Sequence, residues 1–242
     1  MSSAAAWSLA AASALAAVQL GTGLLPDRYG SGGAPMRALS VAGGFSVAFV
    51  FLHLLPALEG AGDAVADGFG RLEHFTGHEA YLLALTGLVA LYGLERFARH
   101  EAARENAPDR VLRAEVGAFA CYYLVVGLLT WDRAAGGAAA LASFTAAVGL
   151  HLLVVDWGIA RRHPVVYRRF ARPLLSASVL AGWAVGGLVE VPDGAVAALL
   201  AFFAGGVVMV ALKEELPGES RGRFGWFFLG TVLYAGMLAA LG

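Results

Sequence analysis

The chain has 242 residues, of which 59% are hydrophobic and only 14% are charged, with a mean hydropathy of +0.69 and a formal net charge of -1. Soluble domains carry about 45–50% apolar and about 25% charged residues, so this composition excludes a soluble globular domain. It also excludes a disordered chain and a basic nucleic-acid-binding protein. The sequence therefore predicts an all-α integral membrane protein that lies in a lipid bilayer and has no nucleic-acid partner.

Eight stretches are apolar and long enough to cross a bilayer, for which a helix needs about 20 residues. They form a single transmembrane domain over residues 1–242 and lie at about 4–25, 36–58, 79–98, 111–131, 137–160, 173–191, 195–213 and 224–242. The first stretch is the least apolar and could be taken for a signal peptide. Because no basic residue precedes it, we interpret it as a membrane span.

The basic residues are distributed very unequally among the loops between these spans. Fifteen of the 17 follow the first, third, fifth or seventh span, whereas Arg71 and Arg133 follow the second and fourth. Cytoplasmic loops carry the excess of arginine and lysine. The distribution predicts eight crossings with both termini outside, in a multi-pass protein of the cell membrane (an inner or plasma membrane).

The predicted outer loop between the second and third spans is acidic. The loop contains five carboxylates and one arginine, Arg71, and it also contains His74 and His78. The acids are Glu59, Asp63, Asp67, Glu73 and Glu79. A mouth of this kind can concentrate cations at an entrance. Carboxylates are also ordinary in any loop that lies in water, so both interpretations stay open.

Three ionisable side chains lie within spans rather than at their ends: His53 in the second, and His151 and Asp156 in the fifth. Ionisable groups at membrane depth are costly to bury and are functional candidates for that reason. At 3.6 residues per turn, His151 and Asp156 are about 140° apart around their helix, so they do not share a face. Each also has a structural interpretation: a histidine bonded to a neighbouring helix, or a carboxylate that snorkels to the inner surface or pairs with Arg161 or Arg162.

The fourth span places Tyr122 and Tyr123 near its centre. The fifth span is its antiparallel neighbour in sequence, so His151 is expected at a similar depth. Tyrosine hydroxyls in apolar surroundings need hydrogen-bond partners. The pattern predicts a tyrosine–histidine pair, either as a structural contact or as part of a site.

Two further features concern packing. Gly182 and Gly186 have the four-residue spacing that favours close contact between membrane helices. Cys121 is the only cysteine, which excludes a disulfide within the chain. Its apolar neighbours predict a buried structural thiol.

Two segments carry a family resemblance. Residues 42–59 are a run of small and apolar residues that ends in His-Leu-Leu-Pro-Ala-Leu-Glu, and residues 204–217 end in Glu-Glu-Leu-Pro. Both are similar to the corresponding helices, the second and seventh, of the ZIP (Zrt/Irt-like) divalent metal transporters. The resemblance implies an eight-helix bundle, possible homodimers, and transport of zinc or iron through a midplane site between helices four and five.

The resemblance also indicates which residues would hold the metal. Of the family's site residues only His151 matches directly. If the chain transports Zn²⁺ or Fe²⁺, we expect His151, Asp156 and His53 as ligands, with Tyr122 and Tyr123 lining the cavity. The chain departs from the family's pattern at this point. Where the fourth helix of the family has His-Asn-x-x-Asp/Glu-Gly, this chain has Tyr-Tyr-Leu-Val-Val-Gly, and its fifth span keeps the histidine but lacks the proline and places an acid one position late.

These departures leave two functional hypotheses. The first is a divalent metal transporter. Zinc favours four nitrogen, sulfur or oxygen donors, which these spans supply poorly, so the alternative is a ZIP-like protein that has lost metal transport and moves another solute, or acts as a sensor or assembly partner. No nucleophile–base motif occurs in the sequence. We therefore expect no enzymatic activity and no cofactor apart from the transported ion.

Overall fold

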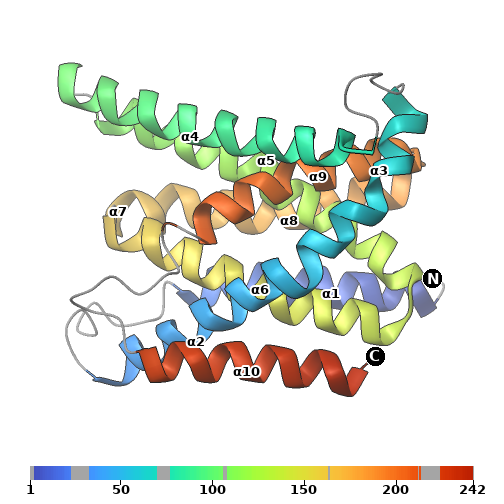
Figure 1. Cartoon of the computed structure of the whole chain (residues 1–242). Helices are drawn as coiled ribbons and strands as arrows, with labels where there is room; N and C mark the ends of the chain where they lie inside the picture. The colour runs from blue at the N-terminus through green and yellow to red at the C-terminus, as the bar shows by residue number, and fades with distance from the viewer. Residues whose placement is uncertain are drawn as a thin grey trace.

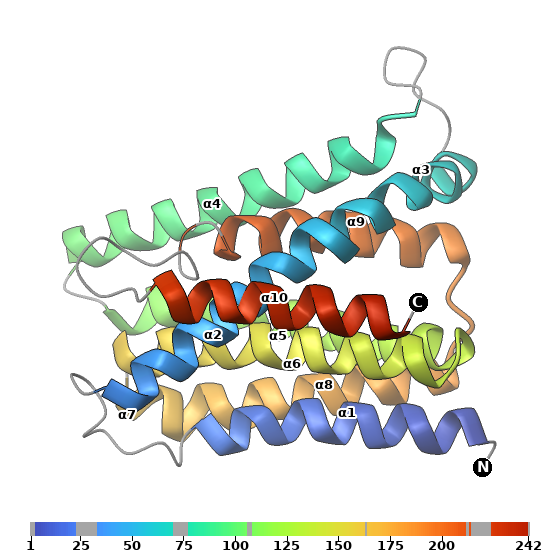
Figure 2. The ribbon, with the colours of Figure 1, turned by 60° about the horizontal axis from the view of Figure 1, so that its bottom comes forward.

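The computed structural model describes residues 3–22, 33–69, 77–105, 108–162, 164–211, 213 and 224–241. Within these ranges the chain forms helices and no β-strand, which confirms the all-α prediction. Most of the helices run roughly parallel or antiparallel to one another, and the two ends of the chain lie at the same end of the bundle (Figure 1, Figure 2).

The helices follow the predicted stretches closely. In chain order they are α1 (Ser3–Thr22), α2 (Gly33–Phe49), η2 (Val50–Leu54), α3 (Leu55–Phe69), α4 (Glu79–Glu105), α5 (Pro108–Ala135), α6 (Ala138–Arg162), α7 (Pro164–Val166), η3 (Tyr167–Ala171), α8 (Arg172–Leu188), α9 (Asp193–Val210) and α10 (Phe224–Leu241). Because α2, η2 and α3 are continuous, as are α7, η3 and α8, a helix covers most of each predicted stretch.

Four helical segments of the described chain are long and apolar enough to cross a membrane: Ser3–Thr22, Ser40–Gly68, Ala138–Trp157 and Asp193–Val210. This number is compatible with a membrane protein. The first of these segments is the one whose alanine-rich sequence is only mildly apolar. The count of eight crossings stays a prediction.

Two short π-helical segments interrupt the long helical runs, and one of them contains His53. The segment η2 ends two residues before Pro56. Proline has no N–H with which to bond the carbonyl of Leu52, four residues earlier. The backbone N–H of Leu55 bonds to the carbonyl of Val50, five residues earlier. Such π segments often occur at functional sites.

Three pairs of helices approach so closely that only glycine fits at the contact. A Cβ atom on any of six glycines would lie between 1.7 and 2.0 Å from a backbone oxygen of the partner helix. The pairs are α2 with α10 (Gly44, Gly230), α4 with α9 (Gly87, Gly205) and α5 with α8 (Gly127, Gly182). The close packing predicted at Gly182 is therefore confirmed, and Gly186 lies against the ring of Trp131 on α5.

A tight turn joins α5 to α6 and makes them antiparallel neighbours. Gly137 adopts a φ of 101° there, a conformation that other residues rarely adopt. Its N–H donates to the carbonyl of Ala134, and its own carbonyl accepts from Leu141. The turn sets Tyr122 on α5 at the depth of His151 on α6.

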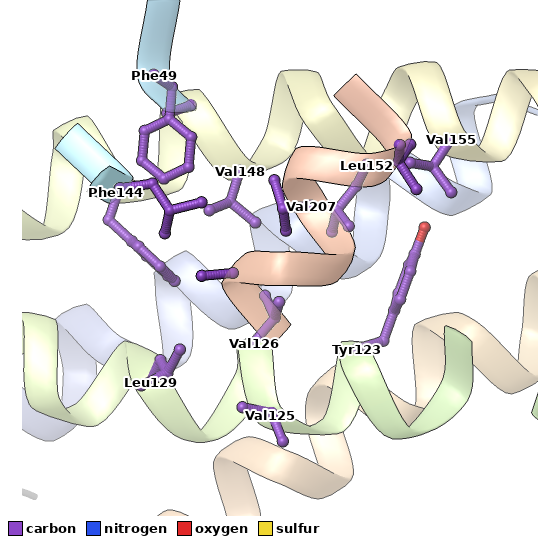
Figure 3. Close-up of a cluster of buried hydrophobic side chains, with 14 of the residues drawn as sticks. Phe49, Tyr123, Val125, Val126, Leu129, Phe144, Val148, Leu152, Val155 and Val207 are labelled. Carbon is purple, nitrogen blue, oxygen red and sulfur yellow. The ribbon is translucent and has the colours of Figure 1, made fainter. Parts of the chain in front are cut away.

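Four helices, α1, α5, α6 and α8, form a set in which each contacts others of the set. The remaining helices lie against this set: α3, α4 and α9 contact one another and meet it through α5, and α2 and α10 contact each other and meet it through α6. Figure 3 shows apolar side chains at this boundary, where Val148 and Leu152 of α6 face Val126 of α5 and Val207 of α9. The candidate site lies at the same boundary.

Candidate functional site

His151 lies in the middle of α6 and is 2% exposed. The hydroxyl of Ser46, a fully buried residue of α2, is 3.2 Å from His151 Nδ1. The ring of Tyr122, from α5, packs edge-on against the imidazole with 6.1 Å between ring centroids. The tyrosine and histidine that were expected to be neighbours therefore do contact each other, and three helices position the imidazole.

The imidazole borders a cavity of about 200 Å³ between α4, α5, α6 and α9, which we call the His151 cavity. Its lining is mainly apolar and includes Leu91, Phe119 and Phe203. Cys121 also lines it and is exposed, so the prediction of a buried thiol is wrong. Apolar neighbours did not imply burial, because the described surface is apolar in many places as well, with side chains such as Leu85 and Tyr92 exposed.

A second cavity, of about 40 Å³, lies between the α2–η2–α3 run and helices α5, α6 and α9. We call it the Arg133 cavity, and His53 and Arg133 are its ionisable lining residues. The two cavities share three lining residues, Tyr122, Phe203 and Val207. The rings of Tyr122 and Phe203 lie 5.5 Å apart between centroids. These side chains separate the two spaces.

His53 is half-buried beside the Arg133 cavity. Its ring stacks on Phe49, one turn earlier, with 5.4 Å between centroids and 21° between the ring planes. Arg133 is near enough for its charge to act on the imidazole. The π segment and the stacking together hold His53 toward α5 and away from His151.

Asp156 is on the other side of α6. Its side chain is fully buried, and its Oδ1 atom accepts a 2.7 Å hydrogen bond from the hydroxyl of Tyr123 on α5. Asp156 lines neither cavity. The expectation that this carboxylate could snorkel to the surface is wrong, because the tyrosine supplies a donor within the helix interface. The side chains of Arg161 and Arg162 lie outside the described part of the structure.

Further polar groups surround Asp156 at the meeting of α1, α6 and η3. The hydroxyl of Tyr167 interacts electrostatically with the carboxyl and donates a 3.4 Å hydrogen bond to the backbone oxygen of Gln19. Asp156 Oδ2 and both polar ends of the Gln19 side chain are buried without a hydrogen-bond partner among the described residues. Gln19 was missed in the sequence because only ionisable residues were considered; a search for any polar side chain in a span would have found it.

The three predicted metal ligands do not come together. His151 and His53 border different cavities, and Asp156 borders neither. Within the described ranges, no group of three or more His, Cys, Asp or Glu side chains could hold a metal ion. At His151 the oxygen atom at hydrogen-bond distance is the hydroxyl of Ser46, and the Tyr122 ring packs edge-on against the imidazole. Ser46 was missed because a serine in a run of small residues is usually a packing residue.

The predicted acidic mouth is described only in part. Arg71, Glu73 and His74 lie outside the described residues. The acids on α3 (Glu59, Asp63 and Asp67) are exposed. Glu79 differs from them because it is only 4% exposed, at the first turn of α4. A carboxylate is stabilised at that position by the partial positive charge of a helix N-terminus.

The chain matches no protein-family model, and no curated protein sequence matches it significantly. The function has to follow from the two cavities, the side chains between them, and the resemblance of residues 42–59 and 204–217 to one transporter family.

Proposed function

We propose that the protein is a ZIP-like membrane transporter of a small solute, with eight crossings and both termini outside. The proposal is supported by the four helices that are apolar enough to cross a membrane and by the unequal distribution of basic residues among the loops. The observation that carries it is the pair of cavities that meet at Tyr122, Phe203 and Val207. Both cavities are lined by residues of α5, α6 and α9, and ligand sites in helical proteins commonly lie between the helices of a bundle.

In this orientation the Arg133 cavity belongs to the outer half of the path, because Arg133 is near the end of α5 that faces outside. The His151 cavity belongs to the inner half. The rings of Tyr122 and Phe203 then close the path between the two halves in the present conformation. Passage requires these two side chains, or the helices that carry them, to move apart.

The lining favours a solute other than a tightly coordinated divalent metal. The His151 imidazole has the Ser46 hydroxyl at 3.2 Å and the Tyr122 ring edge-on beside it. The described residues include no group of three or more His, Cys, Asp or Glu side chains that could hold a metal ion, whereas zinc favours four donors at about 2.0–2.3 Å. The metal hypothesis has a direct test, which is zinc and iron uptake in cells that express wild type or His151→Ala at matched protein levels. Equal uptake in both would contradict metal transport through His151, and a loss in His151→Ala would support it.

Transport itself is tested by flux into liposomes that contain the purified protein, with Zn²⁺, Fe²⁺, chloride and formate as the panel. Val207 lines both cavities, so Val207→Phe should block the path without removing a polar contact. Val232 on α10 is 49% exposed, and Val232→Phe is the matched control. We expect flux to fall about tenfold in Val207→Phe, equivalent to about 1.4 kcal/mol in the barrier, and to stay unchanged in Val232→Phe.

Two results would contradict the proposal. One is wild-type flux no greater than that of protein-free liposomes for every member of the panel. The other is equal flux in wild type and in a folded Val207→Phe variant, because the path between the cavities would then not carry the solute. A circular dichroism spectrum and a monodisperse elution profile establish that the variant is folded.

A further inference from the structure

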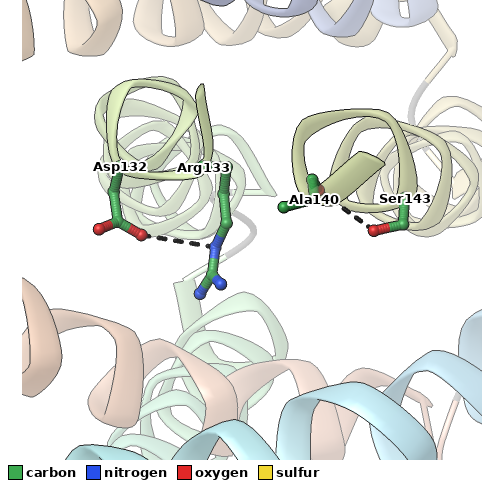
Figure 4. A network of polar contacts seen from close by, with 4 residues as sticks. All are labelled: Asp132, Arg133, Ala140 and Ser143. Carbon is green, nitrogen blue, oxygen red and sulfur yellow. Dashed lines mark hydrogen bonds and ion pairs between the residues drawn. The ribbon is translucent and has the colours of Figure 1, made fainter. Parts of the chain in front are cut away.

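Arg133 is the only residue with a full formal charge among the described residues that line the two cavities. Its side chain is 22% exposed, whereas that of its neighbour Asp132 is 54% exposed. Figure 4 shows the guanidinium group extending away from the α5 ribbon. Arg133 lines the Arg133 cavity together with residues of α9 and of the α2–η2–α3 run, so its positive charge borders that space.

The contacts of Arg133 leave its charge incompletely compensated. Asp132 Oδ2 lies 3.6 Å from Arg133 Nε, which is longer than a hydrogen bond, and Nε is buried without a hydrogen-bond partner among the described residues. The guanidinium carbon lies 5.9 Å from the centre of the Phe144 ring, a cation–π contact. A guanidinium has five N–H donors, and burying a charge is costly unless it is paired and hydrogen-bonded.

The rest of the lining suits an anion better than a cation. His53 adds a second potential N–H donor, the remaining lining residues are apolar apart from the Tyr122 hydroxyl, and no carboxylate lines the cavity in the described structure. The acids on α3 are exposed, and charges in water are screened beyond about 8 Å at physiological ionic strength. Asp132, 3.6 Å from Arg133 Nε, offsets part of the charge, but it is 54% exposed and does not line the cavity, so the charge that borders the cavity is that of Arg133.

We propose that the Arg133 cavity binds a small anion, either a halide or the carboxylate of a very small organic acid, through the Arg133 guanidinium and the His53 imidazole. The size limits the ligand, because about 40 Å³ corresponds to roughly three water molecules. Chloride and formate fit this space, and larger organic anions do not. The inference rests on the proposed function in one respect: if the protein is a transporter, the anion is the solute that the outer half of its path accepts.

Binding is tested on the purified full-length protein, by thermal unfolding in sodium chloride or sodium formate against sodium gluconate at equal ionic strength. We expect chloride, formate or both to raise the melting temperature saturably in wild type. In Arg133→Gln the apparent Kd should rise about tenfold or more, the effect of losing a charge-assisted hydrogen bond. Arg37, an exposed arginine on α2 that lies over Trp226, provides the matched control, and Arg37→Gln should keep the wild-type Kd.

The two salts distinguish the sources of the anion: a shift with chloride alone indicates a halide site, and a shift with formate alone indicates a carboxylate site. No shift with either salt in wild type, or the same Kd in a folded Arg133→Gln variant, overturns the proposal. If Arg133→Gln does not fold, the wild-type protein crystallised in bromide and in formate decides the question. A bromide anomalous peak beside Arg133, or density for formate there in crystals grown in formate, supports the site, and clear maps with neither anion beside Arg133 overturn it.

This test is independent of flux. Anion binding without flux in liposomes would contradict transport and leave the binding site in place. Flux without Arg133-dependent anion binding would contradict the anion site and leave transport in place.

Discussion

The hydroxyl of Tyr123 on α5 donates a 2.7 Å hydrogen bond to Oδ1 of Asp156 on α6, and both side chains are fully buried. The bond joins two neighbouring helices of one set on the side of α6 that faces away from the cavities. It explains how a carboxyl group can lie between apolar helices.

Loss of this bond should destabilise the protein. Tyr123→Phe removes the donor to Asp156 Oδ1 and leaves Tyr167 as the hydroxyl that still interacts with the carboxyl; leaving a buried acceptor unsatisfied costs about 1–3 kcal/mol. Asp156→Asn keeps an oxygen at the same place, so this variant should be at least as stable as wild type. The measurement is thermal or denaturant unfolding in detergent, with Tyr92→Phe, at an exposed tyrosine of α4, as the control. Equal stability of Tyr123→Phe and Tyr92→Phe would show that the bond does not contribute.

The contact of α4 with α9 should tolerate no side chain at its glycines. In Gly205→Ala the new Cβ would lie 1.7 Å from the backbone oxygen of Ala84, and in Gly87→Ala 1.8 Å from that of Phe202. The helices must separate, and we expect a loss of at least about 1–3 kcal/mol, the usual cost of overpacking. Gly93→Ala is the matched control on α4, because its Cβ meets nothing within 4 Å. We expect it to be neutral or to gain up to about 1 kcal/mol from its higher helix propensity.

Folded yield and unfolding midpoint in detergent distinguish these glycine variants. If Gly205→Ala and Gly93→Ala have the same midpoint, the two helices are not in contact at Gly205. The same comparison applies to α5 and α8, with Gly127→Ala against Gly117→Ala, whose Cβ also meets nothing within 4 Å.

Ser46 should control the state of the His151 ring. Ser46→Ala removes the hydroxyl 3.2 Å from Nδ1, and the tautomer of a histidine depends on the hydrogen bond that each ring nitrogen makes. We expect the imidazole ¹⁵N shifts of His151 to change and the stability to fall by about 1 kcal/mol. Ser143→Ala is the control, because the Ser143 hydroxyl donates to the carbonyl of Ala140 on its own helix (Figure 4). Unchanged His151 shifts in Ser46→Ala would contradict the contact.

Cys121 should report on the His151 cavity. It is the only cysteine and is exposed, so one maleimide should attach per chain, and Cys121→Ser should not react. Ala90 lines the cavity and its neighbour Val89 is 57% exposed outside it, so Ala90→Phe and Val89→Phe form a matched pair. We expect labelling to slow about fivefold or more in Ala90→Phe alone, because reaction requires access to the thiol. Equal rates in the two variants would show that the reagent does not reach Cys121 through the cavity.

Helix positions could be predicted from the sequence because about 20 consecutive apolar residues leave few alternatives to a membrane helix. The weakly apolar α1 was identified in this way, and Pro56 provided a local signal for the irregularity at η2. Whether Cys121 is buried or exposed could not be predicted, because apolar neighbours are found both in the core and on the outer surface. The pairing of Asp156 with Tyr123 could not be predicted either, since Arg161 and Arg162 lie closer in the sequence and were equally plausible partners.

The sequence by itself determined the helical class and the positions of the helices, and it indicated that His151 and Asp156 point away from each other, because that angle follows from helical periodicity within one segment. Only the tertiary structure decided what each of them faces. The neighbours of a helix depend on contacts between distant segments, here the glycine contacts that hold α2 against α10, α4 against α9 and α5 against α8. The packing of α2 against α6 places Ser46 beside His151, and the packing of η2, α3 and α5 against α9 brings Arg133 and His53 to the same cavity, separated from His151 by Tyr122 and Phe203.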